Sequence, residues 1–182
     1  MTQQDGRQRV AIENVRPEID GGRFPIKRTV GEEVVVEADA FADGHDVIAV
    51  VLRYRHADST EWTDVSMKHL GNDRWRAVFH VNTLGQWHYT IAGWVDHFET
   101  WRRDLVKKLD AGQNLQVDLL IGAKLIDGAV TRASTDDGRK LAAWRQALRS
   151  NESPDDDRIR IALSADLQAL MARYPDRRLA ST

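Results

Sequence analysis

The spacing of apolar residues changes once along this chain, near residue 100, and that change restricts the fold more than any other feature. Before it, apolar side chains alternate with other side chains, as in Trp75, Ala77 and Phe79. This two-residue period is that of a β-strand with one buried face. After it, Trp101 and Leu105 begin a four-residue spacing that is typical of a helix. The sequence therefore predicts an α+β chain in which strands precede helices.

The first part of the chain reads as roughly seven short strands with turn residues about every ten positions. Val34, Val36, Ala38 and Ala40 fall on one face of a strand. The run from residue 47 to 54 begins apolar on both faces, which suits a central strand. We expect an immunoglobulin-like antiparallel β-sandwich over residues 9–100.

Capping residues mark several helices in the second part. Gly112 is a stop for the first helix, Ser134 or Thr135 can cap a later one, Pro154 stands at a helix start, and Ser164 can cap the last. We expect a small helical bundle over residues 101–182, packed against the sandwich. Residues 1–8 are expected to form a disordered tail.

Composition excludes several classes of protein. Lys and Arg number 26 against 28 Asp and Glu, a formal net charge of −2, so we expect neither a nucleic-acid nor a membrane partner. Cysteine is absent, which excludes disulfides, thiolate zinc sites and cysteine nucleophiles. The first twenty residues have no signal-peptide pattern, and no segment has the ~20 apolar residues of a membrane span. We expect a soluble, cytoplasmic protein.

The sequence contains none of the glycine-rich, nucleophile-elbow, zinc-protease or calcium-loop motifs of common active sites. We therefore expect no catalytic residue, no cofactor and no metal ion. His80 and His88 would form a metal-binding pair if their strands were neighbours, and are otherwise ordinary strand histidines. Glu37 and Asp39 share a strand face, where they are either a glycosidase-like carboxylate pair or two exposed acids. The segment 43–46 is a metal loop or, more simply, a hairpin turn.

The tryptophans separate into two groups. Trp75 and Trp87 alternate with core positions and are expected to be buried. Trp62, Trp94 and Trp101 fit three roles: packing on helices, contact with a partner subunit, or stacking on a sugar ring. The basic side chains of residues 101–108 form a solvated helix face or a surface that steers an anionic sugar phosphate.

Long blocks of the sequence resemble a known family. ENVRPEIDGGRFPIKRTVGE, VVVEADAFADGHDVIAVVLRYR, LGNDRWRAVFHVNTLGQWHYTIAGWVDHFETWRRDLVKK and LMARYPDR are similar to the N-terminal portion of bacterial α-1,4-glucan:maltose-1-phosphate maltosyltransferase, and the resemblance extends from about residue 9 to 178. It implies a retaining, glycoside-hydrolase-like family 13 transferase that moves maltosyl units from α-maltose 1-phosphate to α-1,4-glucans.

In that family the nucleophile and the acid/base lie in a (β/α)8 barrel that follows the segment represented here. Since the chain stops at Thr182, before the barrel, no catalytic residue is carried over and this chain alone is expected to be inactive. The resemblance implies a non-catalytic assembly domain, with a homodimer partner and the catalytic barrel as its contacts. A freestanding enzyme is the least favoured hypothesis.

The family resemblance also implies that the N-terminal domain of one subunit lies near the catalytic region of the other. The loop at residues 21–28 is our candidate for that contact, through Arg23, Phe24, Lys27 and Arg28, whose cations suit phosphate or carboxylate groups. The competing interpretation is a structural loop with solvent-facing bases. The alternative function for the whole chain is an α-glucan-binding β-sandwich module, with Trp62, Trp94 and Trp101 as candidate stacking residues.

Overall fold

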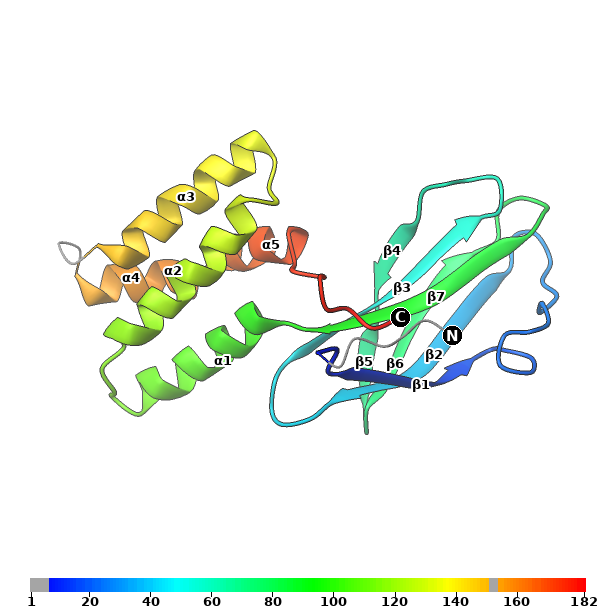
Figure 1. The fold of residues 1–182 in the computed structure, drawn as a ribbon, viewed down its shortest axis with the longest axis horizontal. Helices are drawn as coiled ribbons and strands as arrows, with labels where there is room; N and C mark the ends of the chain where they lie inside the picture. The colour runs from blue at the N-terminus through cyan, green and yellow to red at the C-terminus, as the bar shows by residue number, and fades with distance from the viewer. Residues whose placement is uncertain (1–6, 151–153) are drawn as a thin grey trace. The chain divides into compact units, whose positions relative to one another are not determined.

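The computed structural model describes residues 7–150 and 154–182. It contains two antiparallel sheets followed by helices, so the predicted α+β class is confirmed (Figure 1). The strands are β1 (Val10–Arg16), β2 (Glu33–Ala42), β3 (Ile48–His56), β4 (Thr63–Ser66), β5 (Lys68–Gly71), β6 (Arg74–His80) and β7 (Trp87–Val95). The helices are α1 (His97–Asp110), α2 (Gln116–Val130), α3 (Thr135–Arg149), α4 (Asp155–Ala162) and α5 (Ala165–Arg173).

The chain divides into two compact units. The first comprises residues up to Val95 together with Arg178–Thr182, and the second comprises Asp96–Arg177. The expected boundary at residue 100 thus lies a few residues too late, and the last five residues, which we expected in the helical part, belong to the strand-containing unit. Most of the expected N-terminal tail lies outside the described residues. Within it, Gln8 is described, and its side-chain amide donates to the Ala180 carbonyl over 2.8 Å.

The strands form one sheet in the order β1-β2-β6-β5 and a second in the order β4-β3-β7. The two sheets share one hydrophobic core, because the inward-facing residues of each belong to a single buried cluster. That cluster includes Val34, Val36, Ala38 and Ala40 of β2, Val50 and Leu52 of β3, Ala77 and Phe79 of β6, and Ile91 of β7. The predicted alternation and the central position of β3 are both confirmed.

The chain crosses from one sheet to the other at Met67. This residue is buried, and its backbone N–H donates to the Val50 carbonyl over 2.9 Å. β4 before it pairs with β3, whereas β5 after it pairs with β6. A single extended segment therefore contributes to both sheets.

The C-terminal segment returns to the first unit as an extra edge. Gly93 of β7 and Ser181 exchange two backbone hydrogen bonds of 3.0 and 2.8 Å, and Figure 1 shows the red C-terminal segment beside β7. Ala180 packs against a small cluster formed by Val51, Ala92 and Trp94. These three residues have the opposite parity to the core residues of β3 and β7, so the cluster lies on the outer face of the β4-β3-β7 sheet.

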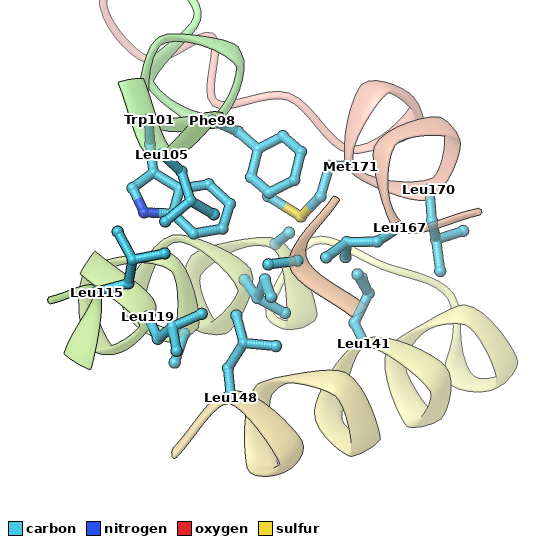
Figure 2. Close-up of a cluster of buried hydrophobic side chains, with 14 residues drawn as sticks. Phe98, Trp101, Leu105, Leu115, Leu119, Leu141, Leu148, Leu167, Leu170 and Met171 are labelled. Atoms are coloured by element: carbon cyan, nitrogen blue, oxygen red, sulfur yellow. The ribbon is translucent and has the colours of Figure 1, made fainter. Parts of the chain in front are cut away.

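All five helices contribute to one core in the second unit (Figure 2). Leu119, Ile126, Leu141, Leu148 and Leu167 are fully buried in it. α1 begins before the predicted residue 101 because Asp96 caps it, its carboxylate accepting the Glu99 N–H over 2.9 Å. Leu105 of that helix is buried, and Trp101 is buried too, which favours helix packing among the three roles considered for it. Leu109, in the last turn, is exposed.

Only some of the predicted capping residues cap a helix in the structure. Ser164 caps α5 as predicted, its hydroxyl accepting the Leu167 N–H over 3.3 Å. Pro154 lies one position before α4, rather than at its first helical residue. Ser134 precedes α3 without a capping hydrogen bond from its side chain. No helix in the described ranges has the length and apolar character that a membrane-spanning segment needs.

Candidate functional site

The loop between β1 and β2 carries the four predicted contact residues, and it is anchored to the first unit at three points. The Tyr89 hydroxyl donates a hydrogen bond to the Pro17 carbonyl, Ile26 packs against the sheet core, and the Gly31 N–H donates to the Val81 carbonyl over 2.7 Å. Burial raises the pKa of Tyr89 above the ordinary value of 10.0. The ends of this loop are therefore fixed by the core of the unit.

Between these anchors the loop forms a small hairpin. Ile19 and Phe24 pair across it, and the Arg23 N–H donates to the Asp20 carbonyl over 3.1 Å. The turn needs three successive residues with positive φ, namely Asp20 at 53°, Gly21 at 62° and Gly22 at 80°. Glycine takes this conformation without a steric penalty, which explains the two glycines in this turn.

The hairpin displays an apolar pair with a cation beside it. Ile19 and Phe24 are about half exposed, at 49% and 52%. The Arg23 guanidinium carbon lies 5.5 Å from the centre of the Phe24 ring, and its Nη1 lies 3.7 Å from Asp20. Of the four predicted residues, the structure thus brings Arg23 and Phe24 together at the hairpin.

Lys27 and Arg28 lie after the hairpin and are both exposed. Arg28 Nη1 donates to the Lys27 carbonyl over 2.8 Å, so these two residues contact each other rather than the hairpin tip. The segment as a whole presents basic side chains on a preformed loop. This arrangement suits contact with an acidic or apolar surface.

The three unassigned tryptophans have different environments. Trp94 is 5% exposed and packs in the small outer cluster, and Trp101 is 7% exposed in the helical core. The Trp101 indole N–H donates to the Asp118 carbonyl over 2.8 Å. Trp62 is 36% exposed, and it is the one of the three with a substantial surface available to another molecule.

Trp75 and Trp87 pack against the sheet core, but both are only partly buried, so the expected burial is met only in part. Their indole N–H groups donate to the carbonyls of Ala40 and Thr83 over 3.0 and 3.2 Å. An indole that packs against the core and has a partner for its N–H has a structural role.

The alternatives that involve paired polar groups are not supported. His80 lies on β6 and His88 on β7, so the two histidines belong to different sheets. Glu37 forms an ion pair with Arg76, and Asp39 lies 3.7 Å from Arg74. Across the part of the chain that the structure describes, no group of three or more His, Asp and Glu side chains is arranged to hold a metal ion.

The acidic turn at residues 43–46 is likewise occupied by a cation of the chain itself. Arg9 contacts Asp43 through Nε at 2.9 Å and Asp46 through Nη1 at 2.6 Å. These hydrogen bonds raise the pKa of Arg9 above its ordinary value. The turn therefore has a structural role rather than a metal-binding one. It is not the expected hairpin, however, because the strands that it joins, β2 and β3, belong to different sheets.

The basic run on α1 is largely paired with acids. Arg103 and Lys107 lie 3.0 and 3.5 Å from Asp104, and Lys108 lies 2.6 Å from Asp118 on α2. The hydrogen bond from Arg103 lowers the pKa of the Asp104 carboxyl below its ordinary value of 3.8. These two acids offset half of the four positive charges of the run, and Arg102 donates to the Leu163 carbonyl instead of an acid.

An exposed apolar face on α2 was not among the sites expected from the sequence. Val117, Leu120 and Ile121 are 67%, 51% and 47% exposed, while Leu119 and Ala123 on the opposite side are fully buried. The signal was present in the sequence, because LQVDLLIGAKLI is apolar around the whole helix rather than along one stripe. A helix of this kind is normally covered on both sides.

Comparison with known proteins gives one consistent result. Residues 8–182 match the family model described as alpha-1,4-glucan:maltose-1-phosphate maltosyltransferase, domain N/S. The maltosyltransferase of that name from Chlorobaculum tepidum is 48% identical over 177 residues, and that from Myxococcus xanthus is 44% identical over 179 residues. The alignments cover 97% and 94% of this chain, but only 26% and 27% of those relatives.

A more distant relative agrees. The alpha-1,4-glucan:maltose-1-phosphate maltosyltransferase 1 of Streptomyces coelicolor is 34% identical, again over 96% of this chain and 26% of its own length. The chain thus spans about a quarter of the length of these curated relatives. On the strength of the near-complete match to the domain model, the chain belongs to the alpha-1,4-glucan:maltose-1-phosphate maltosyltransferase family, in which it corresponds to domain N/S.

Proposed function

We propose that this chain is the non-catalytic, N-terminal assembly domain of a cytoplasmic maltosyltransferase that transfers maltosyl units from α-maltose 1-phosphate to α-1,4-glucans. In this role it holds two subunits together as a homodimer and contacts the catalytic barrel. The first unit acts as an immunoglobulin-like β-sandwich and the second as a small helical bundle. Support comes from the domain match and from relatives that are about four times longer than the chain.

The outward face of α2 is the observation that carries the assembly role. Burying the exposed side chains of Val117, Leu120 and Ile121 would remove apolar surface from water at about 25 cal/mol per Å². Val106 and Leu109 on α1 add two further exposed apolar side chains, at 40% and 38%. A stable contact buries roughly 800 Å² per partner, so these two helices would form its centre rather than its whole.

A second copy of this chain is the occupant that we propose for this face. Symmetric dimers use the same surface on both partners, and an apolar helix face is complementary to itself. Lys108 and Asp118, which belong to α1 and α2, are already paired with each other at 2.6 Å. The face therefore does not carry an unpaired charge at this position that a matching copy would have to bury.

The hairpin at Ile19 and Phe24 is the proposed contact to the catalytic barrel. Its anchored ends and preformed turn reduce the entropy lost on binding. Arg23, Lys27 and Arg28 would add charge complementarity to acidic or phosphate groups of that region. Phe24 would supply the apolar anchor.

Substitution on α2 tests the assembly role. Leu120→Asp and Ile121→Asp each place a charge on the proposed contact, and sedimentation equilibrium should show at least a tenfold weaker dimer, about 1.4 kcal/mol or more. Leu84→Asp is the matched control, because Leu84 is 87% exposed on a loop of the other unit and its substitution should leave the dimer unchanged. If the α2 variants dimerise as tightly as the unmodified chain, the α2 contact is wrong.

The non-catalytic role has a separate assay. The purified chain, incubated with α-maltose 1-phosphate and maltohexaose, should release no phosphate and form no longer oligosaccharide. Product formation that scales with the concentration of the chain would contradict the proposal.

A further inference from the structure

A second exposed surface lies on the outer face of the β4-β3-β7 sheet, toward the end where β3 stops. β3 is the central strand, and its residues alternate between the core and this outer face. Since Leu52 lies in the core, Arg53 and Arg55 project outward, opposite Thr90 and His88 of β7. Trp62, just before β4, joins them, and we call these five residues the Trp62 patch.

The two arginines hold the indole of Trp62. Their guanidinium carbons lie 5.6 Å (Arg53) and 5.1 Å (Arg55) from the centre of the ring. Both distances are within the range of a cation–π contact. Trp62 is therefore fixed by residues of β3 while 36% of its surface stays exposed, which makes it a preorganised aromatic platform rather than a mobile side chain.

The patch also has unused hydrogen-bonding capacity. Arg53 is paired with Asp64 through Nε at 2.9 Å. Arg55 donates to the Ser59 carbonyl through Nη1, whereas its buried Nε has no hydrogen-bond partner in the structure. The buried Nε is out of reach of an external ligand, but a guanidinium has five N–H donors in a planar fork, so the terminal nitrogens of Arg55 keep N–H groups beyond the one bonded to Ser59 that an oxygen-rich ligand can use.

An aromatic face beside planar donors matches the two sides of a pyranose ring. The C–H groups of a sugar are weakly positive and pack on the negative face of an indole, while its hydroxyl oxygens accept from guanidinium N–H groups. We infer that the Trp62 patch binds one or two glucose rings of an α-1,4-glucan chain. This inference rests on the proposed function, in which that polymer is a substrate.

The polymer suits this surface better than the phosphorylated disaccharide. A platform on a sheet face contacts only one side of a sugar, so each ring binds weakly. A polymer that repeats the same unit raises the effective concentration of the next ring and gains avidity from a weak site. A small phosphorylated donor has only one such unit and cannot gain avidity. Its phosphate would also find few bidentate partners, because Arg53 is already paired with Asp64.

Native electrophoresis of the 182-residue chain in gels that contain a linear α-1,4-glucan tests this inference. The unmodified chain should be retarded in proportion to the polymer concentration, and not in gels that contain dextran, an α-1,6-glucan. Trp62→Ala should weaken the apparent affinity for the glucan roughly tenfold. Arg55→Lys keeps the positive charge but lacks the planar N–H donors of the guanidinium, and it should weaken the affinity less. Phe41→Ala is the matched control, because Phe41 is 38% exposed on the other sheet, and it should be retarded like the unmodified chain.

Three outcomes would overturn the inference: no retardation of the unmodified chain, equal retardation of Trp62→Ala, or equal retardation by dextran. Thermal unfolding of Trp62→Ala checks that the fold is kept, and Trp62→Phe, which keeps an aromatic face, should retain part of the affinity. Sedimentation separates this inference from the assembly role. A dimer that does not bind glucan overturns the Trp62 patch alone, whereas loss of the dimer in Trp62→Ala would assign Trp62 to the subunit contact instead.

Discussion

Gly122 of α2 lies directly against the indole of Trp101 on α1. A Cβ atom at position 122 would be 2.2 Å from Trp101 Cζ2 and 2.6 Å from Cη2. The ring cannot easily give way, because it is buried and its N–H is bonded to the Asp118 carbonyl. Glycine at this position therefore permits the close approach of the two helices, which outweighs its unfavourable helix propensity of ~1 kcal/mol.

Gly122→Ala should destabilise the protein by about 2 kcal/mol, because overpacking a rigid ring costs more than the gain in helix propensity. Gly128→Ala, on the same helix, is the control. Its nearest neighbour would be the flexible end of Arg132 at 3.6 Å, so this change should stabilise by about 0.5 to 1 kcal/mol. Urea unfolding measures both, and a Gly122→Ala variant as stable as the unmodified chain would contradict the packing described.

The pairing of Ser181 with Gly93 predicts different effects on stability for two substitutions at position 181. Ser181→Pro removes the N–H that donates to the Gly93 carbonyl and should destabilise the protein by about 1 to 3 kcal/mol. Ser181→Ala keeps that bond and removes a buried hydroxyl that has no partner, so it should be neutral or slightly stabilising. Equal thermal unfolding temperatures for both variants would show that the C-terminal segment does not stabilise the unit that contains the strands.

Tyr174 closes the helical unit through a carboxylate. Its hydroxyl donates to Asp137 Oδ2 over 2.8 Å, and Asp137 is only 8% exposed. Tyr174→Phe should therefore cost about 1 to 2 kcal/mol, because the carboxylate loses a hydrogen-bond donor in a buried site. Arg173→Ala, which removes the exposed arginine 3.1 Å from the same carboxylate, should cost less than 1 kcal/mol. The reverse order in urea unfolding would contradict this account.

Tyr89 predicts a loss of stability in alkaline solution. Its pKa is raised in the folded state, chiefly by burial, so folding favours the neutral phenol. The stability that the neutral Tyr89 phenol adds to the folded state is fully present below pH 10.0, the ordinary pKa of tyrosine. It is lost as the pH rises through the raised pKa of the folded protein. Urea unfolding should be measured at about pH 8 and about pH 11. The free energy of unfolding should fall less between these two pH values for Tyr89→Phe than for the unmodified chain. Equal losses would mean that Tyr89 titrates as an exposed phenol.

The parts of the fold that depend on local periodicity were predictable. The alternation in β2, β3 and β6 identified the residues of the sheet core, and Ser164 correctly marked the start of α5. α1 was predicted late because its cap, Asp96, follows β7 with no intervening turn. Its start depends on one carboxylate rather than on a change in hydrophobic pattern.

The parts that depend on distant contacts were not predictable. The return of Ser181 to Gly93 joins positions far apart in the sequence, and no local propensity of the last residues indicates it. Trp94 has the parity of an outward-facing residue, yet it is buried in a second cluster on the outer face of its sheet. A loop at residues 21–28 was predicted, but the hairpin at Ile19 and Phe24 was not, and the anchors that fix the loop come from β7 and from the segment after β6.

The molar mass of the chain in solution is the most direct test of the assembly role. Light scattering over a concentration series should show a transition from about one chain mass to about two, at a concentration that Ile121→Asp shifts upward by tenfold or more. A single chain mass at every concentration, up to about 1 mM, would contradict the claim that this domain joins two subunits.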